Sequence, residues 1–485
     1  MSGRRVLAID QGTTNTKALL IDGSGRVLAR ASAPLTTSYP HPGWAEQSAS
    51  DIWASVQKVI ADVVRQVDGE IDAIAIANQR ETLVLWDAAT GLPVCPAPIW
   101  QCRRTADDCA GLIAAGHDPK VIAATGLGIN PLFPASKLAW LLRNIPNAAD
   151  LHARGQLRAG TVDSWLLWNL TGGETFATDH SNASRTQLFD TRTLTFSARI
   201  GEIFGAPTDC LPTPLPSDSL FGSTAKGATS LPAGIPIRAM IGDSHAALYG
   251  HGIRAPGAVK ATYGTGSSLM TLTPGRMESR HGLSGTIAWT DRHGTAYALE
   301  GNITVSAQAA AFMAGLLGLT DAAALSALAQ TVPDAGGVTF VPALAGLGAP
   351  HWNDAARGTI AGMTHATRPA HLARATFEAI AQQIADVFEA MQADAGMPLA
   401  RLSADGGASG NRFLMQLQAD LIDRPVQAAR VEEIGALGAA VMAMASMGHA
   451  PEPTEEVVQF HPRMDAKARA KSRQYWAAAI RQAKG

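Results

Sequence analysis

The sequence predicts an α/β protein of two domains, on three grounds: its length, an alternating pattern of strands and helices, and an internal repeat. The chain has 485 residues, of which 46% are hydrophobic and 16% charged, whereas one hydrophobic core rarely extends beyond roughly 250–300 residues. We therefore expect an N-terminal domain at residues 1–248, a C-terminal domain at 249–450 and a helical tail at 451–485.

The first half of the chain alternates the patterns of strands and helices. An apolar run, a polar turn at residues 10–14 and a second apolar run indicate a hairpin of two strands. Amphipathic spacing then indicates a helix, and the apolar run after it indicates a buried strand. The expected elements are strands at residues 6–9, 18–21, 27–31 and 71–77, and a helix at 52–67. This alternation is typical of an α/β fold.

The second half repeats the strand–turn–strand unit. Residues 257–261 lead into a turn rich in Gly, Thr and Ser at 262–268, and another apolar strand follows at 269–272. The repetition indicates a duplicated domain with a join near residues 249–256. Two facing lobes make a cleft that can close on a nucleotide and exclude water.

The composition excludes several classes of protein. The formal net charge is −2, from 41 acidic and 39 basic side chains, and no run of Lys and Arg could follow a nucleic acid backbone. No apolar segment approaches the ~18 residues of a membrane span. None of the cysteines forms a C-x-x-C pair, so we interpret them as buried thiols of a reducing compartment and expect a cytoplasmic protein. The cysteines are Cys95, Cys102, Cys109 and Cys210.

Three Gly-rich turns are candidates for binding a nucleotide. In the first, at residues 10–17, a glycine lets the backbone approach a phosphate, amide N–H groups and Thr hydroxyls point at its oxygens, and Lys17 adds positive charge. Asp10, at the end of a strand, can hold Mg²⁺. The turn at 264–268 would face the first, and the small residues at 405–411 suit a surface against an adenosine. Plain hairpin turns and a helix-capping loop are the alternatives.

A carboxylate after the apolar strand at residues 235–241 is the candidate catalytic group. Asp243 follows Gly242, which permits close approach, and a carboxylate in this position can accept the proton of an attacking hydroxyl. In phosphoryl transfer such a group chiefly orients the alcohol. The alternative is a turn or capping residue. We expect the neighbouring His245 to pack or cap rather than to catalyse.

Polar residues after the buried strand at residues 71–77 are candidates for binding a polyol. Arg80 and Glu81 can bracket vicinal hydroxyls, because one donates and the other accepts hydrogen bonds. The indole of Trp100 can cover the C–H side of the same molecule. A salt-bridged strand end and a core tryptophan are the alternatives.

Several motifs together resemble one family, the FGGY carbohydrate kinases, and among them the glycerol kinases most closely. The likeness runs from about residue 5 to about residue 450. Both signatures of the family are visible, the first containing Lys137 and Trp140 and the second containing Gly362 and His371. The matching segments are residues 10–17, 39–46, 78–82, 100–105, 134–144, 182–186, 346–352 and 358–378.

The resemblance implies two actin-like (ribonuclease H-like) domains with a catalytic cleft between them. It implies ATP with Mg²⁺, and transfer of the γ-phosphoryl to a primary hydroxyl of a small polyol or sugar. The N-terminal domain would bind the acceptor and carry the phosphate turn, and the C-terminal domain would bind the nucleotide. The implied nucleotide contacts are Thr13, Thr14, Asn15, Lys17, Thr265, Gly407 and Asn411, with Asp10 on the magnesium side, Asp243 as base, and Arg80, Glu81 and Trp100 on the substrate.

The sequence departs from the glycerol kinase pattern at three positions of the acceptor pocket. Leu132 replaces a Tyr, Ser244 a Gln and Ser268 a Phe. These changes predict a larger pocket, so a four- or five-carbon polyol or ketose competes with glycerol as the acceptor. Each poorly filled or unpaired contact is worth about 1–3 kcal/mol, so three changes can shift preference by orders of magnitude.

Other departures and alternatives concern regulation and class. Ala307 and Ala311 replace a Gly and a Gln near the nucleotide, and residues 226–234 lack the Arg of the bacterial fructose-bisphosphate regulatory site. A pentulose kinase of the xylulokinase or ribulokinase type is the alternative within the family. Outside it stand a catalytically silent sugar- or nucleotide-binding regulator and an ATPase that needs no acceptor. We expect a homo-oligomer, either a dimer or a tetramer.

Overall fold

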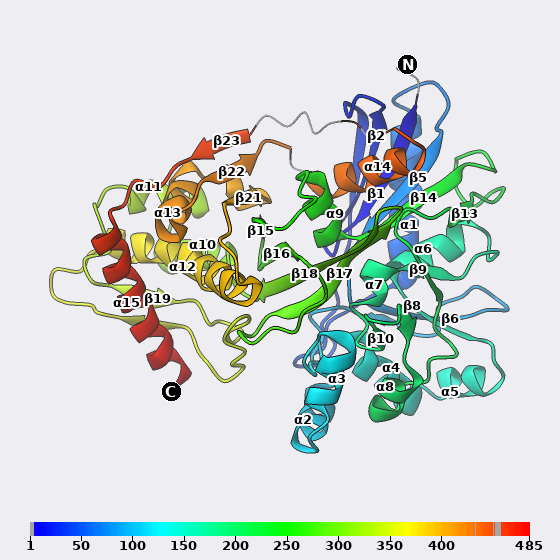
Figure 1. Ribbon diagram of the computed structural model, residues 1–485, viewed down its shortest axis with the longest axis horizontal. Helices are drawn as coiled ribbons and strands as arrows, with labels where there is room; N and C mark the ends of the chain where they lie inside the picture. The colour runs from blue at the N-terminus through cyan, green and yellow to red at the C-terminus, as the bar shows by residue number, and fades with distance from the viewer. Residues whose placement is uncertain (1–3, 432, 450, 452–456) are drawn as a thin grey trace.

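Two mixed β-sheets, each covered by helices, form the two lobes of the protein (Figure 1). This architecture comes from a computed structural model, which describes residues 4–431, 433–449, 451 and 457–485. The first sheet has the strand order β13-β14-β5-β1-β2-β3, and the second has the order β17-β18-β16-β15-β21-β22-β23.

The first sheet contains the predicted hairpin and the strands that pair with it. β2 and β3 continue antiparallel from β1, whereas β5 and β14 run parallel to β1 on its other side. The strands are β1 (Arg5–Gln11), β2 (Asn15–Asp22), β3 (Val27–Pro34), β5 (Ala73–Asn78), β13 (Gly222–Ser223) and β14 (Pro236–Gly242). Helix α1 (Ala49–Val64) packs on β2 and β3. It begins earlier than its apolar pattern because Ser48 caps it, accepting a hydrogen bond from the Asp51 amide.

The second sheet repeats this topology. β16 and β18 continue antiparallel from β15, and β21 and β22 run parallel to β15 on its other side. Its strands are β15 (Ala258–Tyr263), β16 (Ser267–Thr273), β17 (Ser284–Asp291), β18 (Gly294–Ile303), β21 (Arg401–Asp405), β22 (Val426–Ala429) and β23 (Val457–Phe460). The predicted α/β class is therefore confirmed, and the repeated unit occupies the same place in both sheets.

The tail is only partly helical. β23 lies antiparallel to β22 at the edge of the second sheet, and sequence analysis had not expected a strand there. Helix α15 (Ala466–Lys484) follows, and its Trp476 and Ile480 are buried against the second lobe together with Val341. The remaining helices of this lobe are α10 (Gln308–Leu316), α11 (Ala322–Ala329), α12 (Pro369–Ala395) and α13 (Arg412–Ile422), with short strands β19 (Thr339–Val341) and β20 (Thr359–Ala361) and a 3₁₀ turn at Gly407–Gly410.

Smaller elements complete the first lobe, and several of them surround a separate apolar cluster. They are β4 (Glu46–Gln47), β6 (Leu83–Asp87), β7 (Ala97–Pro98), α2 (Ala106–Ala114), α3 (Asp118–Thr125), α4 (Pro134–Asn144), α5 (Pro146–Ala153), β8 (Leu157–Thr161), α6 (Val162–Leu170), β9 (Ala177–Asp179), α7 (His180–Ala183), β10 (Phe189–Asp190), β11 (Thr195–Phe196), α8 (Ala198–Phe204) and β12 (Thr213–Leu215). Within the described part of the chain, no helix has the length and apolar character needed to cross a membrane.

Two helices join the lobes. α9 (Asp243–Gly250) follows β14, and α14 (Ile434–Ser446) lies beyond β22 in the chain. Although α14 comes from the end of the second half, it packs on α9 and on β1, β5 and β14 of the first sheet (Figure 1). Glycines allow the close crossing, because a Cβ on Gly438 would overlap the Ala246 carbonyl oxygen, and one on Gly250 would overlap that of Ile434.

We expect Gly438→Ala to destabilise the protein, because the new methyl group has no space between α9 and α14. Overpacking of this kind costs about 1–3 kcal/mol, which a lower melting temperature would report. The matched control is Gly315→Ala on α10, where nothing lies within 4 Å of the added Cβ. The control should be neutral or slightly stabilising. Equal melting temperatures for the two variants would contradict this packing.

Candidate active site

The two aspartates singled out in the sequence lie at the ends of parallel strands. Asp10 lies near the end of β1, and Asp243 follows β14, with β5 between those strands. Burial and the negative charges of Asp243 and Glu433 raise the pKa of Asp10 to about 6, and Lys17 opposes this shift. The site therefore gathers more negative charge around Asp10 than the protein itself neutralises.

Asp243 is held by an arginine that follows the neighbouring strand, β5. Arg80 Nε donates to Asp243 Oδ1 at 2.9 Å, and the Ser244 amide donates to the same oxygen at 2.6 Å. Gly242 makes room for this contact, because a Cβ there would lie 2.6 Å from Arg80 Cδ. The glycine before the aspartate thus has a steric role, and it brings Arg80 and Asp243 together.

A buried glutamate from the other lobe holds Arg80 in place. This residue is Glu300, on β18. Its Oε1 atom lies 2.6 Å from Arg80 Nη1, and its Oε2 atom lies 2.8 Å from Arg185 Nη2. Glu300 and Arg185 are fully buried, and Arg80 is nearly so. Although burial acts to raise it, the pKa of Glu300 lies below its ordinary value because both arginines stabilise the carboxylate. These ion pairs connect the two lobes directly.

Glu81 lies beside this network in a left-handed backbone conformation, with φ 62°. Arg185 Nε donates to Glu81 Oε1 at 2.7 Å. Lys137 Nζ donates to the backbone carbonyls of Glu81 at 3.0 Å and Leu132 at 2.7 Å. Burial lowers the pKa of Lys137 to about 7. One lysine therefore ties together two of the predicted substrate residues.

Ser244 and Ser268, two of the positions that depart from the family pattern, contact each other. Their Oγ atoms lie 2.7 Å apart, and Ser268 Oγ also donates to Glu300 Oε1 at 2.9 Å. Lys260, fully buried on β15, donates to Ser244 Oγ at 2.7 Å. The hydroxyls thus belong to the same polar cluster as Arg80.

Trp100 contacts the first candidate nucleotide turn, at residues 10–17. Its Nε1 donates to Thr13 Oγ1 at 2.9 Å, so a predicted substrate residue and a predicted nucleotide residue touch. Gln47 Nε2 donates to the Thr13 carbonyl at 2.6 Å, and Gln79 donates to Gln47 at 2.9 Å. This buried amide network fixes the turn. Of the other predicted nucleotide residues here, Thr14 is exposed, and Asn15 and Lys17 are partly buried.

The other two candidate nucleotide segments lie on the second sheet. The turn at residues 264–268 joins β15 to β16, just as the first turn joins β1 to β2, and the loop at residues 405–411 follows β21. Thr265 is exposed, and its carbonyl accepts the Ser306 amide at 2.9 Å. Gly407 is exposed in the 3₁₀ turn after β21. Asn411 caps α13, since its Oδ1 accepts the Leu414 amide at 3.1 Å. Asn411 is therefore a helix-capping residue, which was the alternative interpretation of this loop. A contact between Asn411 and a nucleotide stays a prediction.

Sequence reasoning gave no role to several of these residues. Glu300 and Lys260 are single charges inside otherwise apolar strands, and a buried strand with a lone charge is the one available signal. Arg185 lies in a recognised motif, yet its role depends on Glu81 and Glu300, which are distant in sequence. His245 is buried with a lowered pKa, chiefly because of its burial, as a packing residue would be.

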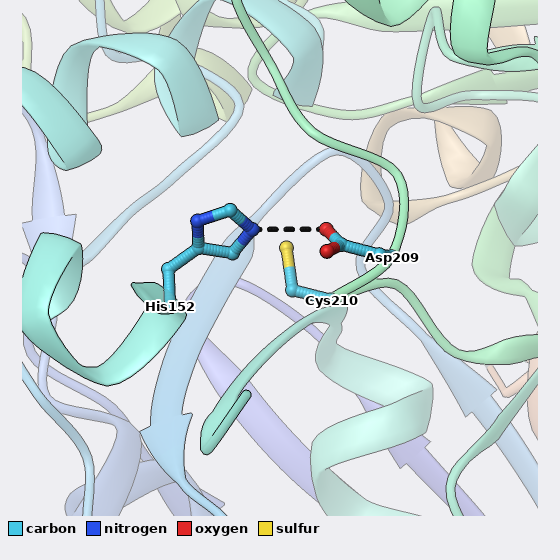
Figure 2. A group of neighbouring side chains, drawn as sticks. All are labelled: His152, Asp209 and Cys210. Atoms are coloured by element: carbon cyan, nitrogen blue, oxygen red, sulfur yellow. Dashed lines mark hydrogen bonds and ion pairs between the residues drawn. The ribbon is translucent and has the colours of Figure 1, made fainter. Parts of the chain in front are cut away.

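A second polar group lies away from these residues. His152, Asp209 and Cys210 offer three possible metal ligands within 4.8 Å of one another (Figure 2). His152 Nε2 already bonds Asp209 Oδ1 at 2.9 Å, and the Cys210 thiol donates to the Pro207 carbonyl at 3.6 Å. Burial, aided by Asp209, raises the pKa of Cys210 to about 12, so the sulfur is a thiol. We therefore interpret this group as a surface hydrogen-bonded pair beside a buried thiol.

All four cysteines are free, as expected. Three of them are buried, but Cys95 is partly exposed, so the expectation of four buried thiols is wrong at that position.

Comparison with known proteins gives matches in both halves of the chain. Residues 5–250 match the N-terminal domain of the FGGY family of carbohydrate kinases, and residues 259–447 match its C-terminal domain. The chain is 43% identical to a glycerol kinase of Symbiobacterium thermophilum over 491 residues, covering 99% of this chain and 98% of the relative. It is 45% identical to an apulose kinase of Pectobacterium atrosepticum over 445 residues, covering 91% and 90%.

Solved structures agree with these sequence matches. A glycerol kinase of Plasmodium falciparum with ADP superposes with a TM-score of 0.92 at 30% identity, covering 99% of this chain and 98% of that one. A xylulose kinase of Rhodospirillum rubrum superposes with a TM-score of 0.86 at 26% identity, with coverages of 99% and 98%.

The duplicated sheets and the carboxylate between them define a two-lobed phosphotransferase of actin-like architecture, which confirms that prediction. The chain belongs to the FGGY family of carbohydrate kinases. It is an ATP-dependent enzyme that phosphorylates an alcohol group.

We expect Glu300→Gln to destabilise the protein strongly, because it leaves Arg80 and Arg185 buried without a full counter-charge. Breaking a buried ion pair costs about 3–5 kcal/mol, which denaturant unfolding would measure. The matched control is Glu278→Gln, where a half-exposed carboxylate pairs with Arg276 and the change should be within about 0.5 kcal/mol. A Glu300 variant as stable as this control would show that the buried network contributes nothing.

Proposed function

We propose that Asp243 is the base that orients a primary hydroxyl of a small polyol or ketose and accepts its proton as the γ-phosphoryl of ATP is transferred. Exposure supports this choice among the carboxylates of the cluster: the Asp243 side chain is 40% exposed, whereas Glu300 is fully buried. An acceptor can therefore reach Asp243 but not Glu300. Arg80 would hold the carboxylate toward the acceptor.

The acceptor would lie against the polar cluster around Arg80. Arg80 and Glu81 would bracket its hydroxyls, with Trp100, Leu132, Ser244 and Ser268 completing the pocket. Relatives of similar identity include glycerol kinases and an apulose kinase, so relatedness alone does not choose the acceptor. Because both serines are small, the pocket would accept glycerol or a four- to five-carbon polyol or ketose. It would prefer the four- and five-carbon compounds to glycerol. A pentulose kinase is the second candidate, because the same serines leave room for more carbons than glycerol has.

ATP would be held by the two equivalent turns and the loop after β21. The predicted contacts are Thr13, Thr14, Asn15 and Lys17 on the first lobe and Thr265, Gly407 and Asn411 on the second. Their backbones and hydroxyls suit phosphate oxygens. The second lobe would carry most of the adenosine contacts, as the resemblance implied.

Asp10 would hold Mg²⁺. The surroundings of Asp10 suit a divalent cation. Burial and the negative charges of Asp243 and Glu433 raise the pKa of Asp10 to about 6, and a bound cation would compensate this negative charge. When bound, Mg²⁺ neutralises charge on the phosphoryl group being transferred. Asp10 itself would position the cation, directly or through water, beside the first turn.

We also propose a cytoplasmic homo-oligomer, a dimer or a tetramer. Four free cysteines suit a reducing compartment. Phe312 and Leu316, one turn apart on α10, are 41% and 61% exposed and offer an apolar contact for another subunit.

We expect Asp243→Asn to lower kcat by about 10²–10⁴-fold, the usual contribution of a general base. Binding of ATP, measured by calorimetry, should be largely unchanged, because the substitution keeps the shape of the side chain. The matched control is Asp107→Asn, an exposed aspartate of α2. Wild-type turnover in the Asp243 variant would remove the proposed mechanism.

A coupled ADP-release assay would identify the acceptor. We expect a higher kcat/KM with erythritol, threitol, erythrulose, xylitol, ribulose or xylulose than with glycerol or dihydroxyacetone. Highest kcat/KM with glycerol would contradict the enlarged pocket. ADP release that does not depend on any acceptor would favour an ATPase.

A further inference from the structure

The side chains beside Asp243 form a hydrogen-bonded chain with a cation at one end and a carboxylate at the other. Lys260 donates to Ser244, and Ser244 contacts Ser268. Ser268 then donates to Glu300. Strand pairing explains the arrangement: Lys260 and Glu300 are each paired with Met270 of β16, so both project from one face of the second sheet, the face that packs on α9.

The charges at the two ends fix which atom donates in each hydrogen bond. An ammonium group has donors only and an ionised carboxylate has acceptors only. Although burial acts in the opposite direction, Arg185 and Arg80 lower the pKa of Glu300, so that end is a carboxylate. Burial lowers the pKa of Lys260, but the nearby Asp405 opposes this and favours the ammonium form.

Each serine hydroxyl has one proton and two lone pairs. Ser268 gives its proton to Glu300, so Ser244 must be the donor in the contact between the serines. Ser244 accepts from Lys260 and Ser268 accepts from Ser244, which uses one lone pair of each. Neither serine keeps a proton to donate, and each keeps one lone pair. Ser268 is the more accessible of the two, since Ser244 is buried.

We propose that the Ser244–Ser268 pair is a specificity-determining wall that only accepts hydrogen bonds, and that it selects an acceptor presenting a hydroxyl there. An acceptor that places a carbonyl, ether or methyl group against Ser268 is disfavoured, because none of these can donate. A ketose therefore binds with its carbonyl turned away from Ser268. This inference rests on the proposed function and narrows it to a requirement at one edge of the acceptor.

Derivatives of the best acceptor from the ADP-release panel test the polarity of this wall. In one series each hydroxyl that is not phosphorylated is replaced by hydrogen, and in a second series by fluorine, which keeps lone pairs but has no proton to donate. At the position facing Ser268 we expect both replacements to lower kcat/KM by about 10- to 100-fold. Dissociation constants from calorimetry without nucleotide should show a loss of similar size.

Ser268→Ala locates that position. In this variant the penalty for the fluoro and deoxy derivatives should shrink to within about twofold at one position and persist at the others. The matched control is Ser267→Ala, because the Ser267 hydroxyl points to the opposite face of β16 and donates to Ser306 Oγ at 2.7 Å. The control should keep the wild-type penalties at every position.

Two results would overturn the inference. A fluoro derivative that binds as well as the parent where the deoxy derivative binds poorly would mean that the pair donates. Penalties that never depend on Ser268 would mean that the pair does not contact the acceptor. If the enzyme phosphorylates no polyol or ketose at all, the proposed function fails, and this inference fails with it.

Discussion

The buried carboxylate of Glu300 is the constraint on which the active-site geometry depends. It comes from the second sheet, yet both of its arginine partners come from the first lobe. A buried ion pair adds little stability over an apolar contact but is costly to break, so it chiefly specifies geometry. Here it sets the direction in which Arg80 presents its Nε to Asp243, and through Ser268 it sets the polarity of the acceptor wall.

Duplication explains why this contact can form. The first hairpin of each sheet has a Gly- and Thr-rich turn, and the sixth strand of each sheet in chain order, β14 or β22, precedes the helix, α9 or α14, that packs on the other helix. α9 and α14 approach closely at Gly250 and Gly438, and Asp10 and Asp243, at the ends of β1 and β14, share one electrostatic environment.

Much of the fold and part of the site could be predicted from sequence. Asp243 could be singled out as a candidate because a carboxylate beside a glycine follows a clear apolar strand, and Thr13 because its turn is rich in Gly and Thr. Glu300 and Lys260 were not found, because a single charge in a strand has no meaning until its partners on other strands are known. β23 was missed because its pairing with β22 is fixed by tertiary contacts rather than by its own short pattern. The boundaries of the two domains and the catalytic, substrate, metal and nucleotide roles of the named residues stay predictions.

The central claim is that Glu300 acts on the reaction by aiming Arg80 at Asp243. A double-mutant cycle of kcat/KM with Arg80→Met and Glu300→Gln, measured with the best acceptor, tests it most directly. If Glu300 acts chiefly through Arg80, Glu300→Gln will lower kcat/KM much less in the Arg80→Met background than in the wild type. Losses that multiply across the two substitutions would contradict the claim and would show that the two residues act independently.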